Sequence, residues 1–234
     1  MIQIEKLATF DIETAGGWAT LADLEKENPK LAELWRKRCG FLRDRFDNNE
    51  ELSDAELFEL KTGLHAEFGK VVCVSFGIYK NGEIIMQSSC DTDEKVVLKW
   101  TADMLDKCNR LGMNLAGHTI DRFDIPFLWK RFLTNGMKPP ALITTFGKKP
   151  WDLTSFDLAK FWSGGAWQEG FTSLDQLATM FGFESPKEAI QASRVHEVFW
   201  KEKDLVGIQK YCEGDVRCTL EIIKTLQDAT TSES

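Results

Sequence analysis

The first predicted strand is the stretch IEKLATFDIE, residues 4–13. Its apolar and β-branched residues favour an extended conformation, and successive side chains of a strand point to opposite faces. Asp11 and Glu13 are therefore expected on one face, with Phe10 and Ile12 on the other. Taken alone, two acids spaced in this way are more typical of a solvated strand than of a functional site.

Two further strands are predicted next to each other in the chain. Residues 71–79 read VVCVSFGIY, a dense apolar strand. Asn81-Gly82 then supplies the two positive-φ residues of a tight hairpin turn, and residues 83–87 return as a third strand. These strands together predict an antiparallel meander.

The chain between the first two strands has helical composition. Residues 21–46 and 53–61 each predict a helix, and Ser53 with Glu56 has the spacing of a capping box. We therefore expect a helical insertion from about residue 15 to 69. Its role is not predicted, since it could serve as a cover or as a partner surface.

The remainder of the chain alternates helices with strands. The predicted elements are a helix at 93–111, a strand at 113–117, a helix at 124–133, a strand at 152–158 and helices at 173–181 and 204–226. Residues 135–151 and 163–171 are loop-like, and residues 228–234 are expected to be a disordered tail. This order predicts one α/β domain over residues 1–227, with a mixed five-stranded sheet flanked by helices.

Composition limits the class of protein. A length of 234 residues fits one domain with a sizeable core, and the chain shows neither a long apolar span nor a signal peptide, so we expect a cytoplasmic protein. The net charge of −8 argues against coating nucleic acid by charge alone, but not against an enzyme that grips a few nucleotides. The six cysteines lack a C-x-x-C pair and are expected to be buried reduced thiols, without a zinc site or a disulfide framework.

Three acidic patterns occur in order along the chain. The first is Asp11-Ile12-Glu13, and the second is Asp124, which lies among apolar residues at a helix start and could be a simple N-cap. The third is Tyr211 with Asp215, which are i and i+4 on the last helix and could merely hydrogen bond to each other. Because one domain can bring all three together, their joint occurrence favours a functional site.

The sequence resembles the DEDDy 3′-to-5′ exonucleases, in particular the stand-alone proteins related to the proofreading domain of family-B DNA polymerases. The resemblance covers nearly the whole chain. Its carriers are Phe10-Asp11-Ile12-Glu13-Thr14, the run from Phe68 to Ser75, Phe123-Asp124-Ile125-Pro126-Phe127-Leu128, Ser173-Leu174 with Ser185-Pro186-Lys187, and Tyr211-Cys212-Glu213-Gly214-Asp215-Val216. The resemblance implies a ribonuclease-H-like fold, and Tyr211 assigns the subclass, because the related His-type enzymes place His where Lys210 stands.

The resemblance also implies the chemistry. Two divalent ions, Mg²⁺ or Mn²⁺, would be held by carboxylates because Mg²⁺ prefers oxygen ligands. By resemblance, Asp11 would bridge both ions, Glu13 and Asp215 would complete the ion on the nucleophile side, and Asp124 would hold the ion on the leaving-group side. Tyr211 would orient the attacking water, and its ordinary pKa of about 10 makes it a poor base by itself.

Substrate contacts are expected around this site. The candidates are Thr14, Trp18, Thr119, Phe123, Lys148 and Lys149. Relatives usually carry Asn where Thr119 stands, which puts the affinity for the substrate strand in question. Lys130-Arg131 could also contact the strand, whereas His118 and His196 are expected to be structural.

The predicted function is hydrolysis of DNA from its 3′ end, with release of nucleoside 5′-monophosphates and a preference for single-stranded or frayed ends. Two alternatives stay open. An exoribonuclease would use the same motifs, since none of them reads a 2′-hydroxyl. The second alternative is a non-catalytic nucleic-acid-binding module, although degenerate modules usually lose metal ligands and all four acids are present.

Overall fold

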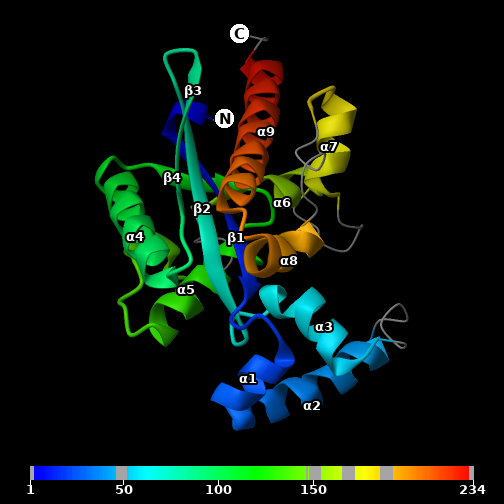
Figure 1. The fold of residues 1–234 in the computed structure, drawn as a ribbon. Helices are drawn as coiled ribbons and strands as arrows, with labels where there is room; N and C mark the ends of the chain where they lie inside the picture. The colour runs from blue at the N-terminus through cyan, green and yellow to red at the C-terminus, as the bar shows by residue number, and fades with distance from the viewer. Residues whose placement is uncertain are drawn as a thin grey trace.

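A five-stranded sheet with the order β3-β2-β1-β4-β5 forms the centre of the computed structural model (Figure 1). The strands are β1 Leu7–Gly16, β2 Gly69–Lys80, β3 Glu83–Cys90, β4 Asn114–Gly117 and β5 Phe156–Asp157. The pairs β1–β2 and β2–β3 are antiparallel, and the pairs β1–β4 and β4–β5 are parallel, so the predicted mixed sheet is confirmed. The structure describes residues 3–45, 52–145, 147, 154–164, 172–184 and 192–231.

Strand β1 begins three residues later than predicted and ends three residues later. Ile4–Lys6 forms a 3-10 turn, in which the backbone N–H of Ile4 donates to the side chain of Gln227 at 2.7 Å. The parallel ladder with β4 begins only at Leu7, opposite Asn114, so the earlier residues have no strand partner there. At the other end, pairing with β2 continues to Gly16 and extends the strand past Glu13.

The predicted hairpin is confirmed by its turn. Asn81 and Gly82 have φ angles of 54° and 85°, the left-handed conformation that the sequence required. Strand β3 runs three residues beyond the predicted Gln87, to Cys90.

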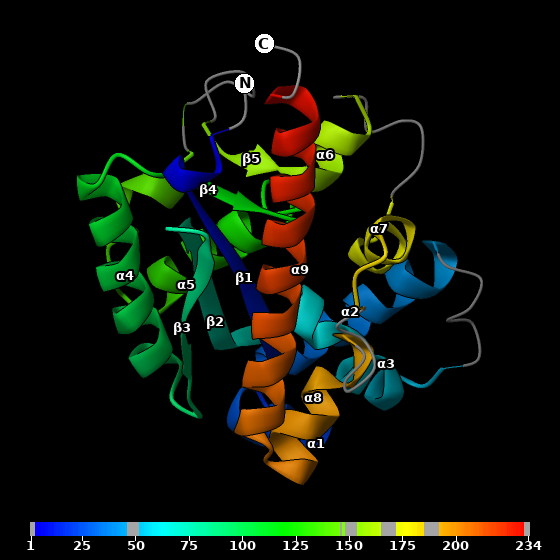
Figure 2. The ribbon, with the colours of Figure 1, turned by 90° about the horizontal axis from the view of Figure 1, so that it is seen from above.

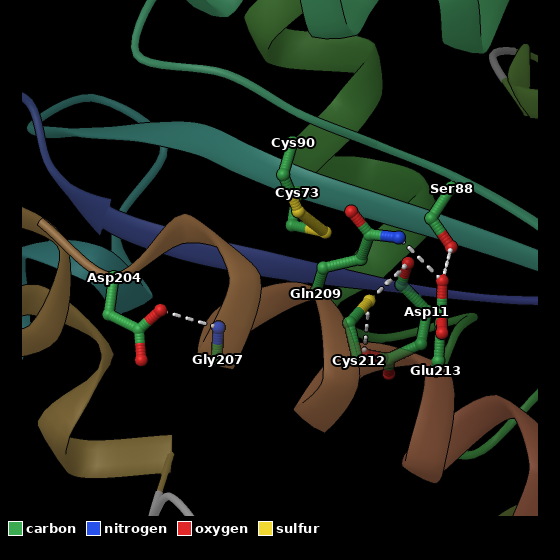
Figure 3. The surroundings of a disulfide bond; sticks show 9 residues. All are labelled: Asp11, Cys73, Ser88, Cys90, Asp204, Gly207, Gln209, Cys212 and Glu213. Carbon is green, nitrogen blue, oxygen red and sulfur yellow. Dashed lines mark hydrogen bonds between the residues drawn. A yellow bond between two sulfur atoms is a disulfide. The ribbon is translucent and has the colours of Figure 1, made fainter.

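The extended hairpin corrects the prediction that every cysteine is reduced. Cys90 lies directly opposite Cys73 in the β2–β3 ladder, and the two form a disulfide (Figure 3). Their 17-residue separation carries no recognisable motif, because the pairing depends on the hairpin register and on the length of β3. Cys39, Cys108, Cys212 and Cys218 are free and buried, as expected.

Helices cover both faces of the sheet (Figures 1 and 2). The helices α4 (Glu94–Arg110) and α5 (Asp124–Thr134) pack on the face that carries Phe10 and Ile12. Helix α9 (Leu205–Thr231) crosses the opposite face. It lies so close to β2 that a Cβ on Gly77 would be 2.7 Å from Val216 and 2.8 Å from Leu220.

The helical insertion is confirmed, with one break that was not predicted. Its helices are α1 Leu21–Glu27, α2 Pro29–Arg45 and α3 Asp54–Lys61. The single helix predicted over residues 21–46 divides at Asn28, because Pro29 disfavours a helical residue before it and is well suited to open the next helix. The capping box of Ser53 and Glu56 is present.

The insertion has a hydrophobic cluster of its own. Trp35, Phe58 and Phe68 stack edge to face, with ring centroids 5.5 Å apart for Trp35 and Phe58 and 5.1 Å apart for Trp35 and Phe68. Trp35 and Phe58 are fully buried. The insertion is thus a packed unit at one end of the sheet (Figure 1).

The C-terminal third differs from the predictions in several elements. In the described part of the strand predicted over residues 152–158, only Phe156–Asp157 pairs with β4. Asp157 then caps α6 (Leu158–Trp162) by accepting the N–H of Lys160. Residues 152–153 and most of the predicted loop 163–171 lie outside the described residues.

Helix α7 (Leu174–Phe181) confirms the helix predicted over residues 173–181, and Ser173 caps it through a capping box with Gln176. The short α8 (Val195–Glu197) and the π-helical turn Val198–Glu202 were not predicted.

Helix α9 continues to Thr231, so the prediction of a disordered tail from residue 228 is wrong as far as Thr231. Lys224 pairs with Asp228 one turn later in this last part of the helix. Among the described residues, no helix is long and apolar enough to cross a membrane.

Candidate active site

One cleft of about 490 Å³ brings together all five residues that the sequence predicted to be catalytic. They are Asp11, Glu13, Asp124, Tyr211 and Asp215. They come from the middle of β1, the first residue of α5 and two adjacent turns of α9. Segments more than 200 residues apart in the sequence therefore meet at one place, Asp11 being adjacent to Cys212.

The two acids of β1 share the face that the strand period predicted. Asp11 and Glu13 line the cleft, whereas the side chains of Phe10 and Ile12 belong to the hydrophobic core beneath α4 and α5, although Ile12 also borders the cleft. The β1–β2 register shifts immediately after Glu13, between Glu13 and Thr14. Such irregularities often lie beside functional sites, because they change the direction of the strand.

The simplest structural interpretation of Asp124 was an N-cap, and the structure does not support it. Phe123 occupies that position, and Asp124 is the first residue of α5. Its Oδ1 accepts the backbone N–H of Ile12 at 3.1 Å, which fixes Asp124 against β1 between Asp11 and Glu13. Its exposed fraction is 3%, so a buried carboxylate is built into the site.

Burial and the repulsion between neighbouring acids both raise the pKa values of the carboxylates in the site. Burial is the largest cause that raises the pKa of Asp11, and the charges of Asp124, Asp215 and Glu13 raise it further. Burial and the charges of Asp215 and Asp124 likewise raise the pKa of Glu13. Burial also raises the pKa of Asp124 to about 7, against the lowering effect of two backbone hydrogen bonds. Carboxylates arranged in this way are relieved either by protons or by cations.

The donor set suits a hard divalent cation. Oxygen atoms of Asp11 and Glu13 lie within 4.8 Å of each other and of the Cys212 sulfur. Burial, followed by the charge of Asp11, raises the pKa of Cys212 well above its ordinary value, so the thiol stays protonated. Its Sγ lies 3.4 Å from the backbone oxygen of Asp11 and 3.6 Å from Oδ2, where it acts as a donor (Figure 3). The ligands on offer are therefore carboxylate oxygens, which Mg²⁺ and Mn²⁺ prefer.

Tyr211 and Asp215 lie one helical turn apart on α9, and both face the cleft. Tyr211 is 4% exposed. Burial, followed by the negative charge of Asp215, raises the pKa of Tyr211. The phenol consequently keeps its proton at neutral pH and can donate a hydrogen bond, but it cannot act as a base by itself.

The predicted substrate contacts divide into three groups. Thr14, Thr119 and Phe123 line the cleft. Trp18 does not: its indole N–H donates to Glu27 at 2.8 Å, and its ring packs on the hydrophobic cluster of the insertion. Lys148 and Lys149 lie outside the described residues.

Thr119 has an unusual backbone, with φ at 68°. A β-branched residue is rarely found in the left-handed region. Asp157 holds it there, because Oδ1 accepts the N–H of Thr119 at 3.1 Å and Oδ2 accepts the N–H of Asp121 at 3.0 Å. Asp157 was not recognised from the sequence, because it lies within the strand predicted over residues 152–158 and its two backbone partners are 36 and 38 residues away.

Arg131 and His196 make structural contacts. Arg131 forms a bidentate pair with the buried Glu94, with 2.8 and 2.6 Å between nitrogen and oxygen, so it is not available to a substrate strand. His196 accepts the N–H of Gly16 at Nδ1, and its Nε2 lies 3.0 Å from Ala19 O, which confirms the structural role. Burial lowers the pKa of His196 and keeps the ring neutral.

Comparisons with known proteins agree with this fold. A family model of the RNase_H superfamily matches residues 59–227. The family B DNA polymerase from the hyperthermophilic archaeon Pyrobaculum calidifontis is similar in structure, with a TM-score of 0.57 and 16% sequence identity over 94% of this chain and 24% of the polymerase chain. No curated protein matches the chain. The chain thus spans about a quarter of the polymerase, and the likeness shows a shared fold.

Proposed function

Because this chain belongs to the RNase H superfamily, we propose that it is a metal-dependent 3′-to-5′ exonuclease that acts on single-stranded or frayed DNA ends. The family and the fold support a nuclease. The finer proposal is carried by one observation, the convergence of four carboxylates and a protonated tyrosine on one cleft. The proposed metal ligands are Asp11, Glu13, Asp124 and Asp215.

Phosphodiester hydrolysis requires a water nucleophile and stabilisation of the charge on the leaving oxygen. Two divalent ions held by the four carboxylates would supply both, by lowering the pKa of bound water and offsetting negative charge. Asp124 is kept in place by the N–H of Ile12, so the ligand set is organised by the fold. The Tyr211 hydroxyl, which stays protonated, orients the attacking water by a hydrogen bond. The products are nucleoside 5′-monophosphates and a strand with a free 3′-hydroxyl.

The direction of digestion is tested with one oligonucleotide labelled at either end. In Mg²⁺ or Mn²⁺, the 3′-labelled strand should release labelled mononucleotide at once, while the 5′-labelled strand gives a descending ladder. Asp11→Ala and Asp215→Ala should remove the activity, and Asp121→Asn should retain it, because Asp121 is paired with Ser155 and Lys160 outside the cleft. Activity that survives Asp11→Ala would come from a contaminant and would contradict the assignment.

Tyr211→Phe separates the water-orienting role from metal binding. The substitution removes only the hydroxyl, so kcat should fall by up to about 100-fold while the metal affinity stays unchanged. An equal loss of metal affinity would argue against this role. A matched RNA oligonucleotide in the same assay distinguishes the exoribonuclease alternative, in which RNA would be the faster substrate.

A further inference from the structure

The active-site cleft has an apolar wall that comes from the helical insertion. Leu60, Lys61 and Leu64, at the end of α3 and in the turn after it, line the same cleft as the four carboxylates. Leu60 is 43% exposed and Leu64 is 57% exposed. Apolar side chains that are exposed together on the wall of a cleft are a candidate contact surface for a ligand.

The wall is held rigidly against β1. The hydroxyl of Thr14 donates to Gly63 O at 2.7 Å, which accounts for Thr14 as a positioning residue. A Cβ on Gly63 would lie 3.0 Å from the backbone oxygen of Thr14, so the two segments are in close contact. Thr62 is fully buried and donates its hydroxyl to Phe58 O, within the cluster of the insertion. Because the wall is already fixed before binding, little conformational entropy is lost when a ligand docks on it.

Charge identifies the part of the ligand that would lie here. Lys61 is the one lysine or arginine among the described residues that line the cleft. The acids that line it are Asp11, Glu13, Glu59, Asp124 and Asp215. Glu59 is neutralised by Lys201 at 2.8 Å. Lys61 makes no ion pair with a described residue, so its ammonium group is available for a phosphate.

We propose that Leu60, Lys61 and Leu64 form the subsite for the 3′-terminal nucleotides of the substrate strand. The two leucines contact the faces of the terminal bases, and Lys61 binds a backbone phosphate. Such a subsite tolerates any sequence, because every base has an apolar face. It gives the insertion a function in holding the strand end next to the carboxylates, and it rests on the proposed exonuclease activity.

The test uses a single-stranded oligonucleotide with phosphorothioate linkages at its 3′ end, which slow cleavage, in Mg²⁺. The Leu60→Ala/Leu64→Ala variant should raise the Kd and KM by on the order of tenfold, since losing the apolar contact of two leucines is worth at least about 1.4 kcal/mol. Val206→Ala, at a residue that is 65% exposed and does not line the cleft, is the matched control. The Mg²⁺-induced rise in Tm should be equal in all three proteins.

Two further readouts separate contact with the strand end from a structural effect. A 2-aminopurine base at the 3′ terminus should change its emission on binding to the parent protein but not to the double variant, whereas an internal probe should behave alike in both. Lys61→Ala should lower the slope of log Kd against log salt by about 0.7, as expected for one phosphate contact to a single strand. The exposed Lys99 provides the control, since Lys99→Ala should leave this slope unchanged.

The outcomes distinguish the two proposals. If the parent protein degrades DNA from the 3′ end but the double variant and Lys61→Ala bind like their controls, the subsite is wrong and the exonuclease stands. If the parent protein neither binds nor degrades single-stranded DNA, both proposals fall.

Discussion

The Asp124 carboxylate accepts the backbone N–H of Ile12, with 3.1 Å between Oδ1 and the nitrogen. Asp124 therefore has a structural task on β1 as well as its proposed task as a metal ligand. The same carboxylate lines the cleft, where a cation would bind.

This double role predicts different results for two substitutions of Asp124. Asp124→Asn keeps an oxygen that can accept the Ile12 N–H, whereas Asp124→Ala leaves that buried donor without a partner, which costs about 1–3 kcal/mol. Both variants should lose exonuclease activity, but only Asp124→Ala should unfold at a lower denaturant concentration than the metal-free parent. Equal destabilisation by both would show that the hydrogen bond contributes little.

The buried carboxylates predict that metal-free protein loses stability as the pH rises. The pKa of Asp124 is raised to about 7, from an ordinary value of about 3.9. Between these values the folded state holds a proton that the unfolded state has lost, so the free energy of unfolding decreases with pH until the group is ionised in both states. For Asp124 the decrease is on the order of 2–4 kcal/mol. Denaturant titrations from pH 5 to 8 should show it in the metal-free parent and a flatter profile in Asp124→Asn, and a parent profile as flat as that of the variant would contradict the prediction.

The part of the site that the sequence predicted consists of local periodicities. Asp11 and Glu13 share a face because side chains alternate along a strand, and Tyr211 and Asp215 share a face because they are four residues apart on a helix. Neither relation requires knowledge of the tertiary structure. The three-strand meander was predictable for a similar reason, since Asn81-Gly82 fixes the hairpin turn.

The features that could not be predicted from the sequence depend on contacts between distant segments. Leu60 and Leu64 resemble ordinary helical residues, and their position becomes visible only when the insertion docks on β1. The Cys73–Cys90 bond depends on the register of β2 and β3. Trp18 follows the first motif closely in sequence, but the fold turns it toward the hydrophobic cluster of the insertion and away from the cleft.

The strained backbone of Thr119 predicts a stabilising substitution. The left-handed conformation costs a β-branched residue roughly 1–2 kcal/mol, and Asn tolerates it better. Thr119→Asn should therefore raise the Tm by about 2–4 °C for each kcal/mol recovered. Lys203, with φ at 57° and outside the cleft, is the matched control, and Lys203→Asn should raise the Tm without changing the KM for DNA. A lower Tm for Thr119→Asn alone would mean that the contact of the Thr119 hydroxyl with His118 outweighs the strain.

Glu13 lies opposite Cys73 in the β1–β2 ladder, so the disulfide is one strand away from a proposed metal ligand. Closing a loop of this size typically stabilises a protein by about 3 kcal/mol. A reductant should therefore lower the free energy of unfolding of the parent by about this amount and should leave the Cys73→Ala/Cys90→Ala variant unaffected. Thiol titration of denatured protein should count four free cysteines before reduction and all six afterwards. Six reactive thiols before reduction would show that the bond had not formed, and a parent protein that counts four but is indifferent to the reductant would show that the bond adds no stability.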